Sequence, residues 1–185
     1  MKELVHDREL SIRTYDLGEQ CILVEGWLTD HRHRPRRDEP TEVPMVVHDM
    51  TARLRVRGPE MLIEEAEAEM PYHPREACTA VLPWIRNLEG LRIARGFTMK
   101  VKEIIGNTRG CAHLTSLIIA MGPSAVQGYW AAYGPERSRM SASEEAVRKV
   151  INTCYVWRED GPLVTSLQDA SKPPDSQEQN PHYDE

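Results

Sequence analysis

The sequence predicts an α+β fold in which one antiparallel sheet carries helices on one of its faces. Segments with strand-like patterns fill the chain up to Met70, and most later segments have helical spacing. Runs of strands followed by helices form antiparallel sheets, whereas parallel sheets need strands and helices in alternation. A doubly wound parallel sheet is therefore not expected.

The first strands are expected to form a hairpin. Short apolar runs lie on either side of the turn-forming segment 16–19, Asp-Leu-Gly-Glu. The apolar residues are Leu10, Ile12, Cys21, Ile22, Val24, Trp27 and Leu28. Residues 29–44 hold three prolines and many charges, so they predict a long polar loop.

The clearest strand runs from Met45 to Arg57, because apolar and charged residues alternate along it. One face carries Val46, His48, Met50, Ala52, Leu54 and Val56. After a turn at Gly58-Pro59, a second strand is expected to place Leu62, Ala66, Ala68 and Met70 inward. Its glutamates would then face the arginines of the first strand.

Apolar residues at helical spacing predict three helices, which begin at Pro74, near Cys111 and at Ser141. A strand from Phe97 to Ile105 is expected between the first two. Gly122-Pro123 is expected to end the second helix. The third opens with a capping-box pattern and would bury Val147, Val150, Ile151 and Cys154.

The length of 185 residues fits one α+β domain over residues 1–157 and a flexible polar tail over 158–185. The hydrophobic content of 40% suffices for a core and excludes a wholly disordered chain. The net charge is 23 − 29 = −6, which argues against nucleic-acid binding.

A cytoplasmic location is expected. No apolar run approaches the ~18 residues that span a membrane, and the first ten residues are too charged for the core of a signal peptide. The four cysteines are therefore expected to be thiols or metal ligands rather than disulfides.

The segment 107–114, Asn-Thr-Arg-Gly-Cys-Ala-His-Leu, is the most informative for function. Its glycine turn places Cys111 at a helix N-terminus, where backbone N–H groups favour the thiolate. With His113 nearby, the pair suits a transition metal or a nucleophile and its base. Burial of Cys111 as a small apolar group is an equally good interpretation.

His48 lies among apolar residues of the clearest strand, and a buried imidazole needs a polar partner. That partner is either a backbone carbonyl or a metal shared with Cys78 and Cys111. Asp49 points to the other face of an ideal strand but would join the site if the strand began there. Cys78 is more often a core residue at such a position.

A cluster of basic residues in the polar loop suits an anionic ligand, such as a phosphate or the nucleotide end of an acyl-coenzyme A. An ordinary solvated loop is the alternative. The arginines are Arg32, Arg34, Arg36 and Arg37, interleaved with His31 and His33.

Several of these segments together resemble a bacterial family known as domain of unknown function 2889. The resemblance covers most of the chain before about Gln127, and Gly-Cys-x-His-Leu at 110–114 is its most specific part. It implies no established activity. The other segments are Val47-His48-Asp49, Glu65-Ala66, Pro74, Cys78, Leu88-Glu89-Gly90 and Gly96-Phe97.

A second resemblance is to iron–sulfur scaffold proteins of the NifU, IscU and SufU type. Those proteins have a strand that opens with Cys-Gly-Asp, a strand with Asp-Ala, a cysteine that opens a helix and a later Arg-x-x-Cys. Segments 47–49, 65–66, 78 and 109–111 come in the same order, without the first cysteine. The resemblance implies a similar fold and a site built from Asp49 or His48 with Cys78 and Cys111.

Three functions are open at this point, and whether the protein is an enzyme is open with them. The first is a zinc, iron or iron–sulfur site in an accessory or carrier component of a metabolic system. Cys78 and Cys111 would be its thiolate ligands, completed by His48, Asp49 or His113.

The second is an enzyme that uses Cys111 as nucleophile and His113 or His48 as base, on a thioester. The third is a structural or regulatory subunit without chemistry of its own. A protein partner or a second copy of the chain is expected, and nucleic-acid and membrane partners are not.

Overall fold

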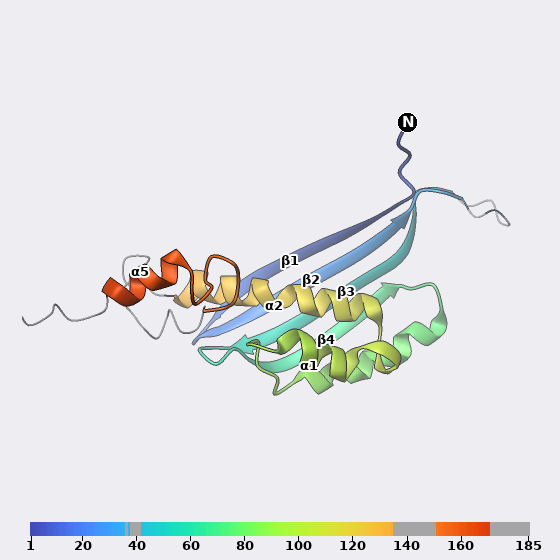
Figure 1. Cartoon of the computed structure of the whole chain (residues 1–185). Helices are drawn as coiled ribbons and strands as arrows, with labels where there is room; N and C mark the ends of the chain where they lie inside the picture. Colours follow the sequence, from blue (N-terminus) through green and yellow to red (C-terminus); the bar gives the residue numbers. More distant parts are fainter. Residues whose placement is uncertain (36, 38–41, 135–150, 171–185) are drawn as a thin grey trace, which may run out of the picture. The chain divides into compact units, whose positions relative to one another are not determined.

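Four antiparallel strands form the sheet, and the fold class predicted from the sequence is confirmed (Figure 1). The structure is a computed structural model that describes residues 1–35, 37, 42–134 and 151–170. The strands follow one another in the sheet in sequence order, as β1 (His6–Gly18), β2 (Cys21–Arg32), β3 (Met45–Arg57) and β4 (Leu62–Tyr72). The hairpin predicted for the first two strands is present.

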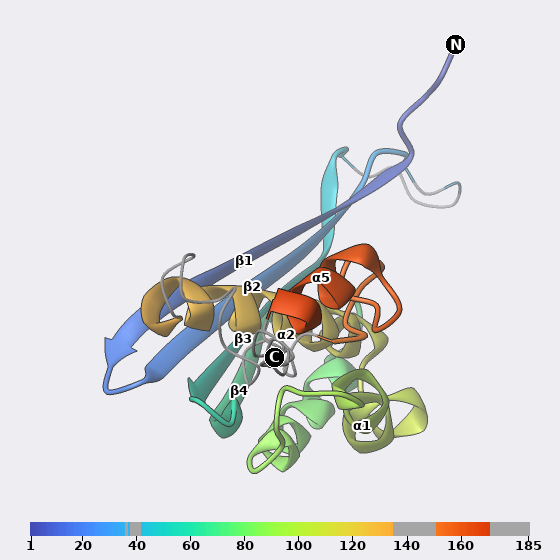
Figure 2. The ribbon, with the colours of Figure 1, turned by 60° about the vertical axis from the view of Figure 1, so that its left-hand side comes forward.

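The helices of residues 1–134 cover one face of this sheet, as Figures 1 and 2 show. The long helix α2 lies across β1, β2 and β3, α1 packs beside it, and η1 packs against β4. Their bounds are η1 (Glu76–Leu88, a 3₁₀ helix), α1 (Phe97–Ile105), η2 (Asn107–Arg109) and α2 (Ala112–Tyr133).

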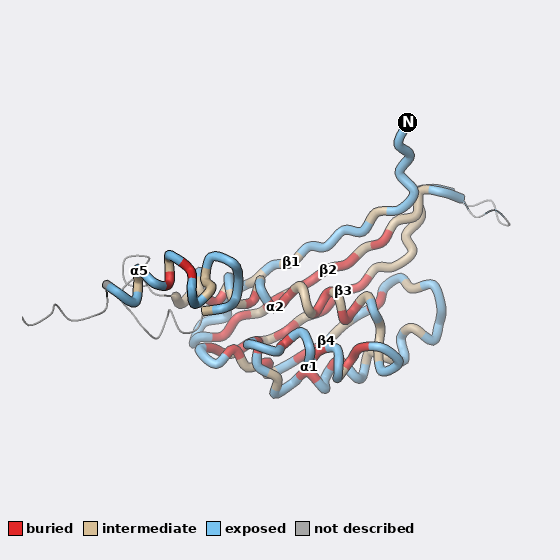
Figure 3. Tube along the Cα trace, viewed as in Figure 1, coloured by how far each residue is buried: buried red, intermediate tan, exposed pale blue. Residues whose placement is uncertain are grey.

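The core lies between the inner sheet face and α2 (Figure 3). Alternate residues of the central strands point into it, because strand side chains alternate between faces. They include Ile22, Val24 and Leu28 of β2 and Met50, Ala52, Leu54 and Val56 of β3, which meet Leu114, Leu117, Ile118 and Met121 of α2. Gly26 lets the helix approach, since a Cβ there would lie 2.9 Å from Met121 Sδ.

The outer sheet face carries the rows of arginine and glutamate that the sequence predicts. Arg53 Nη1 donates to Glu69 at 2.7 Å, Arg53 Nε donates to Glu25 at 2.9 Å, and Arg55 Nη1 donates to Glu65 at 3.2 Å. These ion pairs cross three strands. They keep the outer face polar, so the helices cover only the inner one.

The segment from Phe97 to Ile105 is the helix α1, so the strand predicted there is wrong. Its buried residues are Phe97, Val101 and Ile105, each four positions after the last. That spacing is one face of a helix. In a strand Met99 would share a face with Phe97 and Val101, but Met99 is exposed.

The helix α2 runs on through Gly122-Pro123, where the sequence predicts its end. Gly122 is a packing position, since a Cβ there would lie 2.8 Å from the Phe97 ring. A second correction concerns β4. Its register shifts opposite Arg55 and Val56, so Ile63 is buried in place of Leu62.

Residues 135–185 form a separate compact unit. Within it the structure describes the helix α5 (Pro162–Ala170), with Val164 buried. Cys154 is exposed, so its predicted burial is wrong: residues 151–157 form turns rather than the expected helix. The capping box at Ser141 lies outside the described residues.

The domain boundary at 157 and the flexible tail over 158–185 stay predictions. Among the helices of the described ranges, none combines the length and the apolar character needed to cross a membrane.

Candidate metal centre

Asp30, near the end of β2, is the one charged residue that is buried among the residues the structure describes, with 1% of its surface exposed. It lies two positions beyond Leu28 on the same inward face of the strand. Arg8 of β1 is its partner in the sheet register. Arg8 Nε donates to Oδ1 at 2.6 Å and Nη2 donates to Oδ2 at 2.8 Å, a bidentate pair.

His48 approaches the same carboxylate from β3, where it is paired with Asp30. Its Nδ1 donates to Asp30 Oδ2 at 2.8 Å. An ionised carboxylate can only accept hydrogen bonds, so Nδ1 carries the hydrogen and Nε2 of the neutral ring keeps a free lone pair.

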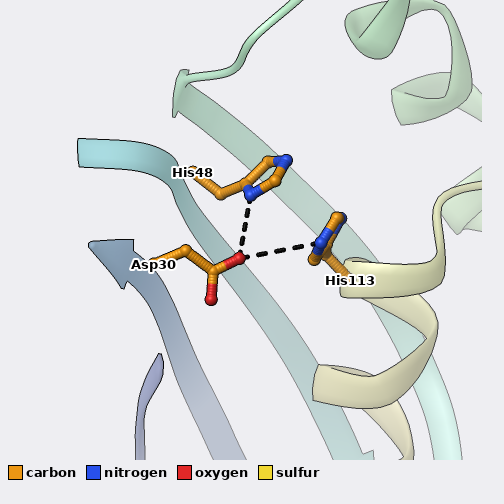
Figure 4. Close-up of side chains that lie close together, drawn as sticks. All are labelled: Asp30, His48 and His113. Atoms are coloured by element: carbon orange, nitrogen blue, oxygen red, sulfur yellow. Dashed lines mark hydrogen bonds and ion pairs between the residues drawn. The ribbon is translucent and has the colours of Figure 1, made fainter. Parts of the chain in front are cut away.

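His113 comes from the first turn of α2 and completes the group (Figure 4). Its Nε2 lies 3.6 Å from Asp30 Oδ2, and its ring stacks on that of His48 with 3.8 Å between centroids. On its other side, Nδ1 lies 3.6 Å from Cys111 Sγ. Three distant segments therefore bring a carboxylate, two imidazoles and a thiol together.

The turn before α2 fixes the position of His113. Thr115 Oγ1 donates both to Ile105 O at 2.9 Å and to Cys111 O at 2.8 Å, which ties the start of α2 to the end of α1. Gly110 is needed in this turn, because a Cβ there would lie 2.0 Å from Ile105 O.

The Asp30 carboxylate is ionised at neutral pH. Burial alone would raise its pKa, but the hydrogen bonds from Arg8 and His48 outweigh burial and lower the pKa to about 2. The pKa of His113 is lowered by burial first, and then by its electrostatic interactions with His48 and Arg8, which together outweigh the opposite effect of Asp30. A neutral imidazole and an ionised carboxylate are the forms that bind metals.

The spacing of these groups suits one metal ion. One potential ligand atom from each of Asp30, His48 and His113 lies within 4.8 Å of the other two. Ligands at ~2.1 Å from a tetrahedral zinc lie roughly 3.4 Å apart. The 3.6 Å from Asp30 Oδ2 to His113 Nε2 is close to that spacing, whereas the 2.8 Å from Oδ2 to His48 Nδ1 is the hydrogen bond described above.

The comparison with known families covers the part of the chain that holds this site. The model of the family described as protein of unknown function (DUF2889) matches residues 6–127. The chain belongs to this family. The matched range of the DUF2889 chain contains Arg8, Asp30, His48 and His113. Searches of curated proteins and of solved structures find no match, and the resemblance to NifU-type scaffolds stays a prediction.

The structure of this DUF2889 chain brings together some of the residues that the sequence predicts as ligands. His48 and His113 join the group, and Cys111 lies beside it through His113. Asp49 and Cys78 are not members of the group. Asp49 follows His48 in β3 and so points to the other sheet face, whereas Cys78 in η1 packs against the core.

Asp30 is the residue that sequence reasoning missed. Residues 29–44 look like a loop because they are polar, and this interpretation ends the strand at Leu28. The strand continues to Arg32. The alternation of Ile22, Val24 and Leu28, extended by two positions, would have placed the carboxylate inward.

The basic loop of the DUF2889 chain is partly paired with acidic residues. Arg34 Nη2 donates to Glu3 at 2.6 Å, and Asp7 binds His31 and His33. Arg36 lies outside the described residues. The anionic ligand expected at Arg32, Arg34, Arg36 and Arg37 stays a prediction.

Proposed function

We propose that this protein binds one transition-metal ion, zinc or iron, through Asp30, His48 and His113. The observation that supports it is the meeting of a buried, ionised carboxylate with two imidazoles within 4.8 Å. Nitrogen and oxygen ligands of this kind suit both metals. In this proposal the protein is an accessory or carrier component that acts in the cytosol.

The ligand set favours a single ion over an iron–sulfur cluster. Clusters are held by cysteine thiolates, and the group contains none. Three protein ligands leave further coordination positions free for water or a substrate. The His48 and His113 side chains are 13% and 27% exposed, which leaves the ion a path in and out.

Arg8 would orient the Asp30 carboxylate for metal binding. Its two hydrogen bonds fix both oxygens of the carboxylate, and groups that orient a ligand in this way commonly determine metal affinity. Its positive charge opposes the ion. The affinity therefore reflects a balance between orientation and repulsion.

Zinc titration of metal-free protein, followed by calorimetry and elemental analysis, tests this function. One equivalent of zinc should bind, and His48→Ala and His113→Ala should each weaken binding by about 100-fold. His31→Ala is the matched control, because His31 binds Asp7 instead. Absence of binding, or equal binding in all four proteins, would contradict the proposal.

A second function is favoured by the order in which Asp30, His113 and Cys111 lie next to one another. The His113 ring lies between a thiol and a carboxylate, with Cys111 Sγ and Asp30 Oδ2 each 3.6 Å from one of its nitrogens. A nucleophile, a base and an orienting carboxylate follow one another in this order in cysteine hydrolases. In this second proposal His113 takes the proton from Cys111, whose sulfur attacks the carbonyl carbon of a thioester. An acyl-cysteine forms, the substrate's carbon–sulfur bond breaks, and the departing thiol takes the proton back from His113.

Alkylation by iodoacetamide of protein treated with a chelator tests the second function. Cys111 should react faster than the exposed Cys154, and His113→Ala should slow its reaction by about tenfold. Cys78, half-buried and with no imidazole partner in the described part of the chain, is the internal control. If Cys111 reacts more slowly than Cys154, the proposal of a thiol nucleophile fails.

A further inference from the structure

The strand β1 leaves a long edge of the sheet open. It has 13 residues and pairs with β2 alone in the described part of the chain. Natural edge strands are usually protected by proline, by lysine or other charged residues, by a bulge, by short length or by a covering helix or loop. Between His6 and Asp16, β1 has no proline or lysine and its pairing with β2 is regular. Most of β1 is exposed, as Figure 3 shows. The apolar residue Leu10 is 48% exposed.

The backbone groups that this edge offers can be identified. His33 N donates to Val5 O at 3.1 Å, so odd-numbered residues of β1 direct their backbone groups to β2. Hydrogen-bonded and non-hydrogen-bonded pairs alternate in an antiparallel ladder. The even-numbered residues therefore direct their N–H and C=O groups to the open edge.

The geometry points to a second copy of this chain as the occupant: we propose that β1 pairs antiparallel with β1 of another copy about a two-fold axis at Ser11. This register pairs even-numbered residues with each other, as the open backbone groups require. It joins two four-stranded sheets into one continuous sheet. Metal binding is not required for it.

The side chains of β1 are complementary to themselves in this register. Leu10 faces Ile12 of the second copy on the inner face, and Glu9 faces Arg13 on the outer face. Val5 faces Leu17, and His6 faces Asp16. Cross-strand pairs of opposite charge and of apolar residues stabilise sheets.

The charged pair decides between registers. Within the described residues, Glu9 and Arg13 take part in no ion pair, and Arg13 instead lies over the Trp27 ring at 5.2 Å. An axis at Glu9 or at Arg13 would place like charges opposite each other. An axis at Leu10 would place the charged Arg8 opposite the apolar Ile12. An axis at Ile12 would place the apolar Leu10 opposite the polar Thr14.

Sedimentation of the metal-free protein between about 1 and 100 µM, with charge variants, tests the pairing. The natural chain should be a dimer. Glu9→Arg and Arg13→Glu each create two like-charge contacts, so each should raise the dimer dissociation constant at least about tenfold at low salt. The double variant restores opposite charges and should return to within about threefold of the natural value.

Three results would overturn the proposal: a monomer at every concentration, a dimer that neither single variant weakens, or a double variant as weak as the single ones. Circular dichroism of each variant excludes misfolding as the cause.

Disulfide trapping gives a second measurement that depends on the axis itself. Two Ser11 Cα atoms at the axis would lie about 4.5 Å apart, within the range of a disulfide. Ser11→Cys, in a Cys154→Ser background because Cys154 is exposed, should form a covalent dimer on mild oxidation.

Glu9→Cys in the same background is the matched control. Its two sulfurs would lie roughly four residues, or about 13 Å, apart, so it should form no covalent dimer. Equal cross-linking of the two variants would place the axis elsewhere and overturn the register.

Discussion

The Asp30 carboxylate is buried and nevertheless ionised. It is the last buried residue of β2, and burial by itself favours the protonated acid. It also accepts hydrogen bonds from Arg8 and His48, which require the carboxylate. The hydrogen bonds prevail, with a pKa of about 2, so the charge that a cation needs is present before any cation arrives.

Replacing Arg8 by glutamine separates its two effects on metal affinity, which are orientation of the Asp30 carboxylate and repulsion of the metal ion. The variant keeps an amide donor but loses the positive charge, so zinc should bind several-fold more tightly. The metal-free protein should lose about 1–3 kcal/mol of unfolding free energy, because a charged hydrogen bond to a buried carboxylate is lost. Urea denaturation and calorimetry measure both effects.

Arg95→Gln, at an exposed position, is the control for Arg8→Gln. If Arg8→Gln binds zinc more weakly while Arg95→Gln binds it normally, then orientation of the carboxylate outweighs repulsion.

The metal-free protein should lose stability on acidification, in two steps. The folded pKa of His113 is lowered, so the unfolded state takes up its proton first as the pH falls below about 6.5. Asp30 adds a loss of up to about 2 kcal/mol as the pH falls from about 4 to its folded pKa of about 2.

Urea denaturation at a series of pH values measures this loss, with His113→Gln as the comparison. The variant should show a flatter curve between about pH 7 and 5.5 than the natural chain. Parallel curves over that range would show that His113 is not buried in neutral form.

Among the site residues, His48 and His113 could be found from the sequence because each breaks a local pattern. A histidine amid apolar strand residues and a histidine after a glycine turn both need an explanation. Asp30 continues the alternation of inward-facing residues in β2 but lies in a polar segment that resembles a loop. Cys78 was predicted as a ligand from its place at the start of a helix, as in the NifU-type scaffolds, and its surroundings are apolar.

At the scale of elements, close approach between α2 and the sheet positions the site. Gly128 of α2 lies against Thr14 of β1, where a Cβ would be 2.5 Å from Thr14 Cβ. Thr14 Oγ1 also donates to Ser124 O at 3.3 Å. These contacts hold the helix along β1, and its first turn then meets Asp30.

Gly128→Ala should destabilise the protein by about 1–3 kcal/mol, although alanine favours helices, because the added methyl forces α2 away from β1. Ala131→Gly, at an exposed position of the same helix, should cost about 1 kcal/mol from helix propensity alone. Urea denaturation measures both. A more stable Gly128→Ala variant would show that the contact with Thr14 is loose.

The element predictions failed where local patterns are ambiguous. Phe97 to Ile105 fits both a strand and a helix, and packing of Phe97 against Gly122 decides for the helix. The glycine that looked like a helix end is the contact that joins α1 to α2. The pattern of a single segment does not show that Phe97 and Gly122 come into contact.

At the scale of the whole molecule, the order of strands and helices was enough to predict the α+β class, because antiparallel meanders follow chain order. It was not enough to assemble the site. His48, Asp30 and His113 meet only after the register of β2 on β3 and the start of α2 are fixed. The site proposed from the tertiary structure therefore replaces the predicted cysteine ligands by a carboxylate.

X-ray absorption at the zinc edge of the zinc-loaded protein tests that replacement most directly. Binding by Asp30, His48 and His113 predicts a first shell of nitrogen and oxygen at about 2.0–2.2 Å, with outer-shell scattering from two imidazoles. A sulfur contribution at about 2.3 Å would instead show that cysteine holds the ion and would contradict the site described for this protein.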